Sequence, residues 1–422
     1  MRIGTYPRWP LVLGVAGVVA LAGCGVGGGN KSSGTSANAK QTIVFATQGL
    51  GAEGDASKAA VAGFEKAHPK ITVKILTLSP VSNNAYQQLQ QRFVAKSGTP
   101  DVITSDVIWP ATFAKAGWLA PLDSFHPDTS RFFSGQVQSV RYKGKTYGVP
   151  WFINAEGVYY RTDLVPSPPK TPQQLVSDAK AAMKKDPSLK EGLAFEGDKY
   201  EGAVTALVNF LGAYGGRLDP ANLDSPQNVQ GLQFMRDTIY KYGIAPKAVT
   251  GWQESQVQSA WLSGQTPFAM NWPYIFSLSE AKGSKVKGRT GWIPFPAGSN
   301  TPQAALGGDD LVVNANSTHK AAAWEFIQYL SSPKVQIERA VAAGDPPAVT
   351  AAYTSALYAR APYFKQEKAV FQDASPRPVN PAYPKISDQL QTMLSSVLTG
   401  QEQAKAALAR TGPQVKSLAS GG

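Results

Sequence analysis

Residues able to bind a ligand through hydrogen bonds and stacking are spread along the chain, mostly where predicted strands or helices begin or end. Asp106 follows a short apolar strand pattern at 102–104, Asn154 lies at the entry of the strand pattern INAEGVYYRTDL, and Glu254 lies near a predicted helix start in GWQES. The other candidates are Trp272 in the segment NWP, the pair Gly307 and Gly308 before a predicted strand, and Arg377 in the proline-fixed loop PRPVNP.

These residue types together suit a carbohydrate. The chain has 9 Trp and 16 Tyr, beside many Asn, Asp and Gln in predicted loops. The apolar C–H face of a pyranose packs on an aromatic ring, while its neighbouring hydroxyls pair with carboxylate, amide or guanidinium groups. Glycines without side chains let backbone N–H groups approach a ligand.

Each candidate also has an ordinary structural explanation. Glu254 near a helix start complements the helix dipole, Trp272 is a plausible core aromatic, and Arg377 is a plausible partner in a structural salt bridge. We interpret the adjacent Tyr159 and Tyr160 as core residues, because neighbouring side chains of a strand point to opposite faces.

Catalytic and metal-binding signatures are scarce. The three histidines are scattered, and the sequence has no HExxH, GxSxG, GxGxxG or P-loop motif. The single cysteine excludes a disulfide within the chain and a thiolate metal cluster. We therefore expect no catalytic residues, no cofactor and no metal.

The N-terminus predicts export and lipid attachment. Arg2 and Arg8 precede the apolar run LVLGVAGVVALAG, which is shorter than the ~20 residues that span a bilayer, so residues 1–23 are expected to be a signal peptide. The segment LAGC forms a lipobox in which Cys24 is the expected lipidation site. Residues 24–40 are rich in Gly, Ser and Asn and predict a flexible tether. The folded part is then expected to begin near residue 41, on the outer face of the cytoplasmic membrane.

Strand and helix patterns alternate after residue 41, which predicts an α/β fold with parallel strands. The first half of the pattern contains strands at 42–47, 71–78 and 102–104 and helices at 56–67, 85–95 and 110–116. A hairpin is expected at 143–148, with Pro150 ending its pairing. The second half predicts strands at 157–160, 192–195, 267–271 and 311–313 and helices at 172–185, 202–214, 229–242, 255–263 and 319–330.

Charge does not point to nucleic acid. The formal net charge is +12, but no dense Lys/Arg run and no basic helix face interleaved with aromatics occurs in the sequence. The excess is diffuse, and we expect no nucleic-acid partner.

From Cys24 onward the chain resembles the extracellular sugar-binding lipoproteins of ABC importers, the family 1 solute-binding proteins whose fold is like that of maltose-binding protein. The resemblance rests on the lipobox and on the segments GTPDVITSDVIWPATFAKAGWLAPLD, KGKTYGVPWFINAEGVYYRTDL, SAWLSGQTPFAMNWPYIF, LGGDDLVVN and KAAAWEFIQYLSSP. It implies a type II periplasmic-binding fold with two lobes, hinge crossovers and a ligand cleft between the lobes. It also implies a first lobe of 41–150 plus 306–347 and a second of 151–305 plus 348–422.

Within that family the sequence looks closest to trehalose-binding lipoproteins. This implies a monomer that captures a disaccharide, either trehalose or a related α-glucoside, and delivers it to the transmembrane subunits of a permease. By the same resemblance Asp106, Asn154, Glu254 and Arg377 would hold sugar hydroxyls, Trp272 would stack on a glucose ring, and Gly307 and Gly308 would line the cleft with backbone. The chain departs from those relatives at Asp309 and Asp310, which follow the glycine pair, and in the loop QGLGAEGD that contains Glu53.

Two other function classes stay open. A lipid-anchored glycoside hydrolase would use Asp106 and Glu254 as its carboxylate pair, although nothing near them in the sequence obviously raises one pKa to make an acid. A binder of amino acids, polyamines or iron is also possible in principle, but its binding site would be expected to contain clustered charged residues and not the tryptophans found in this sequence. Asp309 and Asp310 leave room for an amino sugar, and Arg377 for an acidic one.

Overall fold

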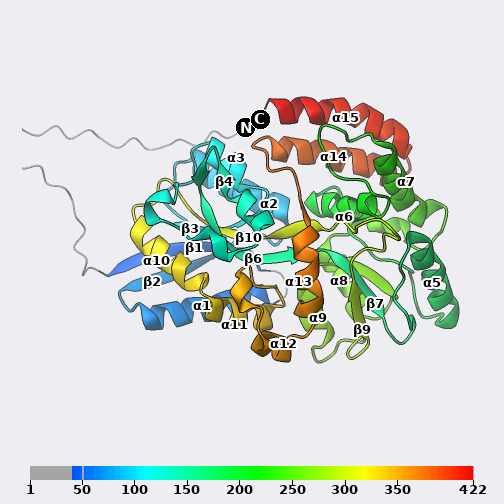
Figure 1. The fold of residues 1–422 in the computed structure, drawn as a ribbon, viewed down its shortest axis with the longest axis horizontal. Coiled ribbons are helices and arrows are strands. Elements are labelled where there is room, and N and C mark those ends of the chain that lie inside the picture. The colour runs from blue at the N-terminus through cyan, green and yellow to red at the C-terminus, as the bar shows by residue number, and fades with distance from the viewer. Residues whose placement is uncertain (1–39, 50–51, 422) are drawn as a thin grey trace, which may run out of the picture. The chain divides into compact units, whose positions relative to one another are not determined.

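The structure is a computed structural model, and it describes residues 40–49 and 52–421 (Figure 1). The expected signal peptide, Cys24 and the tether up to residue 39 lie outside the described residues. No helix in the described part is both long and apolar enough to span a bilayer.

The larger sheet has six strands. Its central path runs β11-β10-β3-β1-β2, and β6 also pairs with β10. β1 is parallel to β2 and β3, as the alternating pattern predicts, whereas β10 runs antiparallel to both β3 and β6. The six strands are β1 (Gln41–Thr47), β2 (Ile71–Thr77), β3 (Val102–Asp106), β6 (Gly148–Ala155), β10 (Ala305–Val313) and β11 (Ser375–Pro376).

The smaller sheet has the strand order β8-β7-β9, and all of its pairings are antiparallel. Its strands are β7 (Gly157–Arg161), β8 (Phe268–Asn271) and β9 (Thr290–Ile293). The predicted hairpin is formed by β4 (Arg141–Tyr142) and β5 (Lys145–Thr146). The six-stranded sheet and the three-stranded sheet are each the centre of one lobe. The chain crosses between the lobes after β6, after β9 and again after β11.

Helices cover both sheets. Those with residues packed in the cores beside the larger sheet are α1 (Glu53–Ala67), α2 (Ser82–Val94), α3 (Pro110–Lys115), α4 (Ser134–Ser139), α10 (Lys320–Leu330), α11 (Pro333–Ala343), α12 (Ser355–Arg360) and α13 (Phe364–Asp373). Those in the cores beside the smaller sheet are α5 (Pro172–Lys185), α6 (Glu201–Gly212), α7 (Pro226–Tyr240), α8 (Glu254–Leu262), α9 (Tyr274–Ser279), α14 (Tyr383–Leu398) and α15 (Ala404–Ser420).

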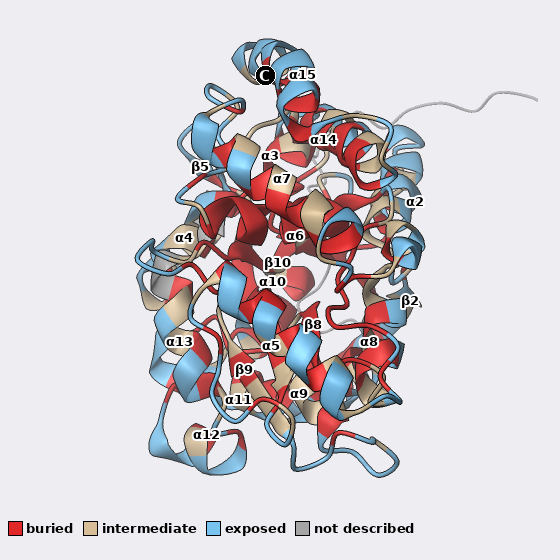
Figure 2. Cartoon of the chain, turned by 90° about the vertical axis from the view of Figure 1, so that its right-hand side faces the viewer, coloured by how far each residue is buried: buried red, intermediate tan, exposed pale blue. Residues whose placement is uncertain are grey.

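Burial follows the alternation of the strands. On β1, Phe45 enters one hydrophobic core and its neighbour Ala46 enters the core on the opposite face. Tyr159 on β7 is fully buried, and Tyr160 packs against a different core, so the expected placement of this pair on opposite faces is confirmed. α6 is buried along its whole length, and Figure 2 shows it as an internal helix.

The C-terminal segment divides its packing between the two lobes. Residues from Ala348 to Phe371 belong to a core beside the larger sheet, whereas Ile386 to Val415 belong to the core beside the smaller sheet. That residues 348–422 as a whole belong to the second lobe stays a prediction.

Three expectations about strands are wrong. Residues 192–195 form no strand, because the N–H groups of Gly192 and Leu193 both donate to the carbonyl of Ile244, and only Ala194 bridges to Ala269. Pro150 does not end the pairing: it lies inside β6, where the register shifts between Asp309 and Asp310. Such an irregularity is a usual place for a strand proline.

The third correction concerns the glycine pair. Gly307 and Gly308 do not precede a strand; they lie within β10, opposite Asn154 and Ile153 of β6. A methyl group on Gly308 would lie 2.2 Å from the carbonyl oxygen of Phe152, and the residue has a φ of +109°. Only glycine allows this backbone conformation and this approach of the two strands.

Candidate functional site

A pocket of about 660 Å³, including open space at its mouth, lies between elements of the two lobes. All seven residues proposed from the sequence as ligand contacts line it, together with ten others: Gln48, Glu53, Pro80, Ser82, Phe152, Glu201, Gly202, Thr205, Tyr274 and Asp309.

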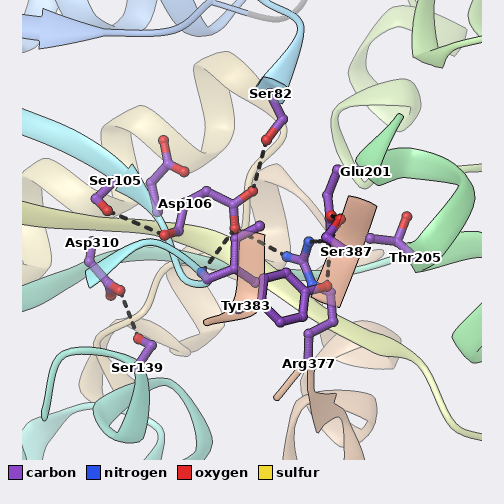
Figure 3. Close-up of polar contacts among 12 residues, drawn as sticks. Ser82, Ser105, Asp106, Ser139, Glu201, Thr205, Asp310, Arg377, Tyr383 and Ser387 are labelled. Atoms are coloured by element: carbon purple, nitrogen blue, oxygen red, sulfur yellow. Dashed lines mark hydrogen bonds and ion pairs between the residues drawn. The ribbon is translucent and has the colours of Figure 1, made fainter. Parts of the chain in front are cut away.

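Asp106 is the last residue of β3, at the carboxyl end where parallel strands present ligand sites. Its Oδ1 accepts the backbone N–H of Ile108 at 3.3 Å and an Nη2–H of Arg377 at 3.1 Å, and its Oδ2 accepts the hydroxyl of Ser82 at 3.4 Å. These three donors hold the carboxylate at the edge of the pocket (Figure 3).

Arg377 follows β11 and is only 4% exposed. Besides Asp106 it contacts Glu201, the first residue of α6, with 2.6 Å between Nη1 and Oε1. Although burial disfavours its charge, Asp106 and Glu201 together raise the pKa of the Arg377 guanidinium. The salt bridge that we considered as the ordinary explanation for Arg377 is therefore present, and the residue lines the pocket as well.

Glu201 lines the pocket but was not predicted from the sequence. Among such residues it has the most side-chain partners. Its carboxylate accepts the Tyr383 hydroxyl at 2.7 Å and the Ser387 hydroxyl, both from α14, in addition to Arg377 (Figure 3). Burial raises its pKa despite these donors. The only sequence signal was an acid at the start of an otherwise apolar helix, which the helix dipole already explains.

On the second lobe, Glu254 and Trp272 are both half-buried at the pocket. Glu254 is the first residue of α8, where Gln253 and Gln256 form a capping box. The side chain of Asn271 donates to the Glu254 carbonyl at 3.2 Å and accepts the Trp272 N–H at 2.8 Å. Tyr159 donates its hydroxyl to the Trp272 carbonyl at 3.0 Å. Trp272 is thus fixed at the pocket rather than packed wholly inside a core.

Gly307 lets two candidate residues approach each other. A methyl group there would lie 2.3 Å from Asn154 Oδ1 and 2.6 Å from the ring of Trp272. Asn154 is 7% exposed, and its Oδ1 has no hydrogen-bond donor among the described residues. The site therefore presents an amide acceptor beside an aromatic face.

The pocket is acidic. Burial raises the pKa of Glu254 to about 7, the nearby charge of Asp106 contributing, and burial together with Asp106 raises that of Asp309 to about 7. This corrects the expectation that nothing near Asp106 and Glu254 raises a carboxyl pKa.

Asp310 faces away from the pocket, where Ser139 donates to its Oδ2 at 2.7 Å. No group of His, Cys, Asp and Glu able to hold a metal ion occurs in the described residues.

Three comparisons place these features among known proteins. Residues 48–337 match the family model described as bacterial extracellular solute-binding protein. A protein of Deinococcus radiodurans named as a probable ABC transporter-binding protein is 31% identical over 397 residues, covering 89% of this chain and 92% of that protein.

Two solved structures are similar over nearly the whole described chain. Maltose-bound MalE3 of T. maritima is 32% identical, with a TM-score of 0.84 over 90% of this chain and 100% of that one. The GacH receptor of Streptomyces glaucescens, solved unliganded and with acarbose, is 28% identical, with a TM-score of 0.81 over 90% of this chain and 99% of that one.

Proposed function

We propose that the chain captures a disaccharide in the pocket between its lobes. It belongs to the bacterial extracellular solute-binding protein family. It is a sugar-binding protein of an ABC transporter and not an enzyme. The proposed ligand is trehalose or a related α-glucoside. The observation that carries the proposal is that Trp272, Asn154 Oδ1 and the carboxylates of Asp106 and Glu254 all line one pocket.

The arrangement suits a sugar. The ring of Trp272 offers a flat apolar surface, and around it lie acceptors for hydroxyl donors: Asn154 Oδ1, Glu254 and Asp106. The guanidinium of Arg377 offers donors, and the glycine pair keeps the wall at β10 thin.

Hinge closure is the proposed means of capture. Asp106, Gly307 and Gly308 come from the sheet of the first lobe, while Glu254 and Trp272 come from the second, so a sugar touching both sets prefers the form in which the lobes are close. A ligand shifts such an equilibrium only by its preference for one state. The permease would then read the closed form.

The family works outside the cytoplasm, and we propose that this chain is held there as a monomer by a lipid on Cys24, behind the signal peptide 1–23. A glycoside hydrolase is not favoured although Glu254 has a raised pKa, because Asp106 is engaged by Arg377 and Ser82. A non-sugar binder is not favoured either, because Trp272 contributes an aromatic ring to the pocket lining.

Calorimetric titration tests the proposal directly. Trehalose is expected to bind with micromolar affinity and without turnover, and maltose, sucrose, a cello-disaccharide and glucose 6-phosphate serve as comparators. A folded protein that binds none of these sugars would contradict the proposed ligand class.

A further inference from the structure

Three glutamates meet in the second-lobe wall of the pocket, and we name Glu156, Glu196 and Glu254 the carboxyl cluster. Glu156 lies between β6 and β7, Glu196 follows the bridge at Ala194, and Glu254 begins α8. Glu156 and Glu196 are fully buried, while Glu254 reaches the pocket. The cluster thus extends from the pocket surface into the interior of the lobe.

The cluster has fewer donors than acceptors. Asn209 donates to Glu156 Oε2 at 2.7 Å, and Tyr200 donates to Glu196 Oε2 and also interacts with the Glu254 carboxyl. The second oxygens, Glu156 Oε1 and Glu196 Oε1, are buried and have no hydrogen-bond partner among the described residues. Buried acceptors without donors are costly, so the two inner carboxyls are best accommodated in their protonated, neutral form unless a positive charge lies near them.

Positive charge is also in short supply. Among the described residues no Lys, Arg or His forms an ion pair with Glu156, Glu196 or Glu254. Arg377 is near enough to favour ionisation of Glu156, but its Nη atoms contact Glu201 and Asp106. The remaining charged and titratable groups at the pocket are Glu53 of α1, Asp106 of β3, Asp309 of β10, Glu201 of α6 and Tyr274 of α9.

This imbalance affects protonation near neutral pH. Burial, followed by the charge of Glu254, raises the pKa of Glu156 to about 8 and raises that of Glu196 strongly. Burial raises the pKa of Glu254 to about 7. The cluster therefore retains protons at pH 7, and a cation bound beside it would displace them.

The pocket surface in front of the cluster is complementary to an ammonium group. Glu254, the unpartnered Asn154 Oδ1 and the face of Trp272 all offer negative charge or electron density. An ammonium has three N–H donors and no acceptor, and a cation is attracted to the face of tryptophan. A hydroxyl would form a hydrogen bond but, being neutral, would not favour ionisation of the carboxyls, whereas an ammonium would.

We propose that the sugar taken by this pocket carries a protonated amino group, which binds between Glu254, Asn154 Oδ1 and the ring of Trp272, with Glu156 and Glu196 behind it. The inference rests on the proposed function and narrows its substrate class to amino-substituted α-glucosides.

Titration of the full chain with trehalose, 6-amino-6-deoxytrehalose and 2-amino-2-deoxytrehalose tests this inference. At pH 8 at least one amino sugar is expected to bind about tenfold or more tightly than trehalose, as for a buried charge-assisted hydrogen bond. The advantage of the 6-amino sugar should shrink at pH 6, where the cluster holds its protons while a primary alkylamine stays charged, as lysine does with its pKa near 10.4. Measurements in two buffers of different ionisation enthalpy should show proton release on binding of the amino sugar.

Glu254→Gln is the informative variant, because it removes the charge and keeps the shape. It should bring the affinities for the amino sugar and trehalose to within about threefold, while Glu338→Gln on the exposed face of α11 should leave the difference unchanged. If trehalose binds and neither amino sugar binds more tightly, the inference is overturned and the proposed function stands. If none of the three sugars binds, the proposed function itself falls. Proton release in the wild-type protein is an independent readout should Glu254→Gln fail to fold.

Discussion

Arg377 and Glu201 form a buried ion pair in which Nη1 and Oε1 are 2.6 Å apart, although 176 residues separate them in the chain. Glu201 begins the internal helix α6, and the other end of the same guanidinium contacts Asp106 at the end of β3. One side chain thus connects the larger sheet of the first lobe to the central helix of the second. The pair contributes to the pocket wall and to the cohesion of the lobes together.

Replacing this arginine should reduce stability strongly. Arg377→Met would leave the carboxylates of Glu201 and Asp106 without their cation, and breaking a buried pair in this way costs about 3–5 kcal/mol. The matched change is Arg360→Met, whose exposed pair with Glu338 has an N···O distance of 2.8 Å and whose loss should change stability little, because solvent screens it. Urea unfolding of the two variants measures both values, and equal losses would contradict the structural role of Arg377.

Sugar binding should depend on Glu254 and Trp272. Alanine at either position is expected to weaken binding about 30-fold or more while the fold stays intact, because both side chains line the pocket. Calorimetry supplies the affinity and circular dichroism the check on folding. An unchanged affinity in one variant would remove that residue from the proposed site.

The glycine pair should tolerate no side chain. Gly307→Ala would push against Asn154 and Trp272, so we expect loss of sugar affinity, whereas Gly308→Ala would meet the carbonyl of Phe152 at a positive φ and should cost about 1–3 kcal/mol in stability. Gly251→Ala is the control, because a methyl group there would meet no atom within 4 Å. Thermal unfolding and calorimetry of the three variants separate the two effects, and a Gly307→Ala protein with normal affinity would be inconsistent with this geometry.

The ligand-free protein should lose stability as pH rises from about 5 to 8. Glu254, Glu156 and Asp309 have pKa values raised to about 7, 8 and 7, so the folded state binds more protons than the unfolded state above pH 4.5. Their contribution to stability is then present at low pH and decreases as pH rises to the folded pKa. The loss is about 1.4 kcal/mol for each pH unit between the unfolded and the folded pKa of a group.

Calorimetric melting temperatures at pH 5, 6, 7 and 8 measure this dependence. Glu254→Gln should raise the melting temperature at pH 8 and change it little at pH 5, since the amide needs no proton to stay neutral. A melting temperature that rises steadily from pH 5 to 8 would show that these carboxyls are not buried as described.

Cys24→Ser should release the protein from the membrane. A diacylglycerol thioether plus a further acyl chain supplies the two hydrophobic anchors that stable attachment requires, and serine offers no thiol for the bond. Fractionation of cells that express both forms should find the wild type with membranes and the variant in the soluble extracytoplasmic fraction.

The residues that line the pocket could be predicted from the sequence more completely than the contacts between them. Asp106 and Trp272 could be predicted because each follows a recognisable strand pattern. The alternation of strands and helices indicated that the carboxyl ends of the parallel strands lie at one edge of the sheet. The partners of Arg377 could not be found, since no local pattern relates residue 377 to Glu201 or to Asp106. Glu156 and Glu196 were missed for a similar reason: an acid in an apolar segment does not reveal that burial has raised its pKa.

Strand limits failed where tertiary contacts overrode local preference. A glycine pair normally indicates a turn, yet Gly307 and Gly308 continue β10, because their lack of side chains is what lets β6 approach. The segment at 192–195 had the composition of a strand, but the N–H groups of Gly192 and Leu193 donate to the carbonyl of Ile244, and only Ala194 pairs with β8.

The pairing of β10 with β3 and β6 has a consequence for how the protein is made. β3 and β6 cannot complete their pairing until residues 305–313 are available. These residues follow β7, β8 and β9 of the other lobe in the chain. Until then the first sheet has an unpaired edge at β3, a feature that invites association between chains. Contacts so distant in sequence also slow folding. The newly made chain therefore passes through an interval in which the edge of β3 is open to other chains.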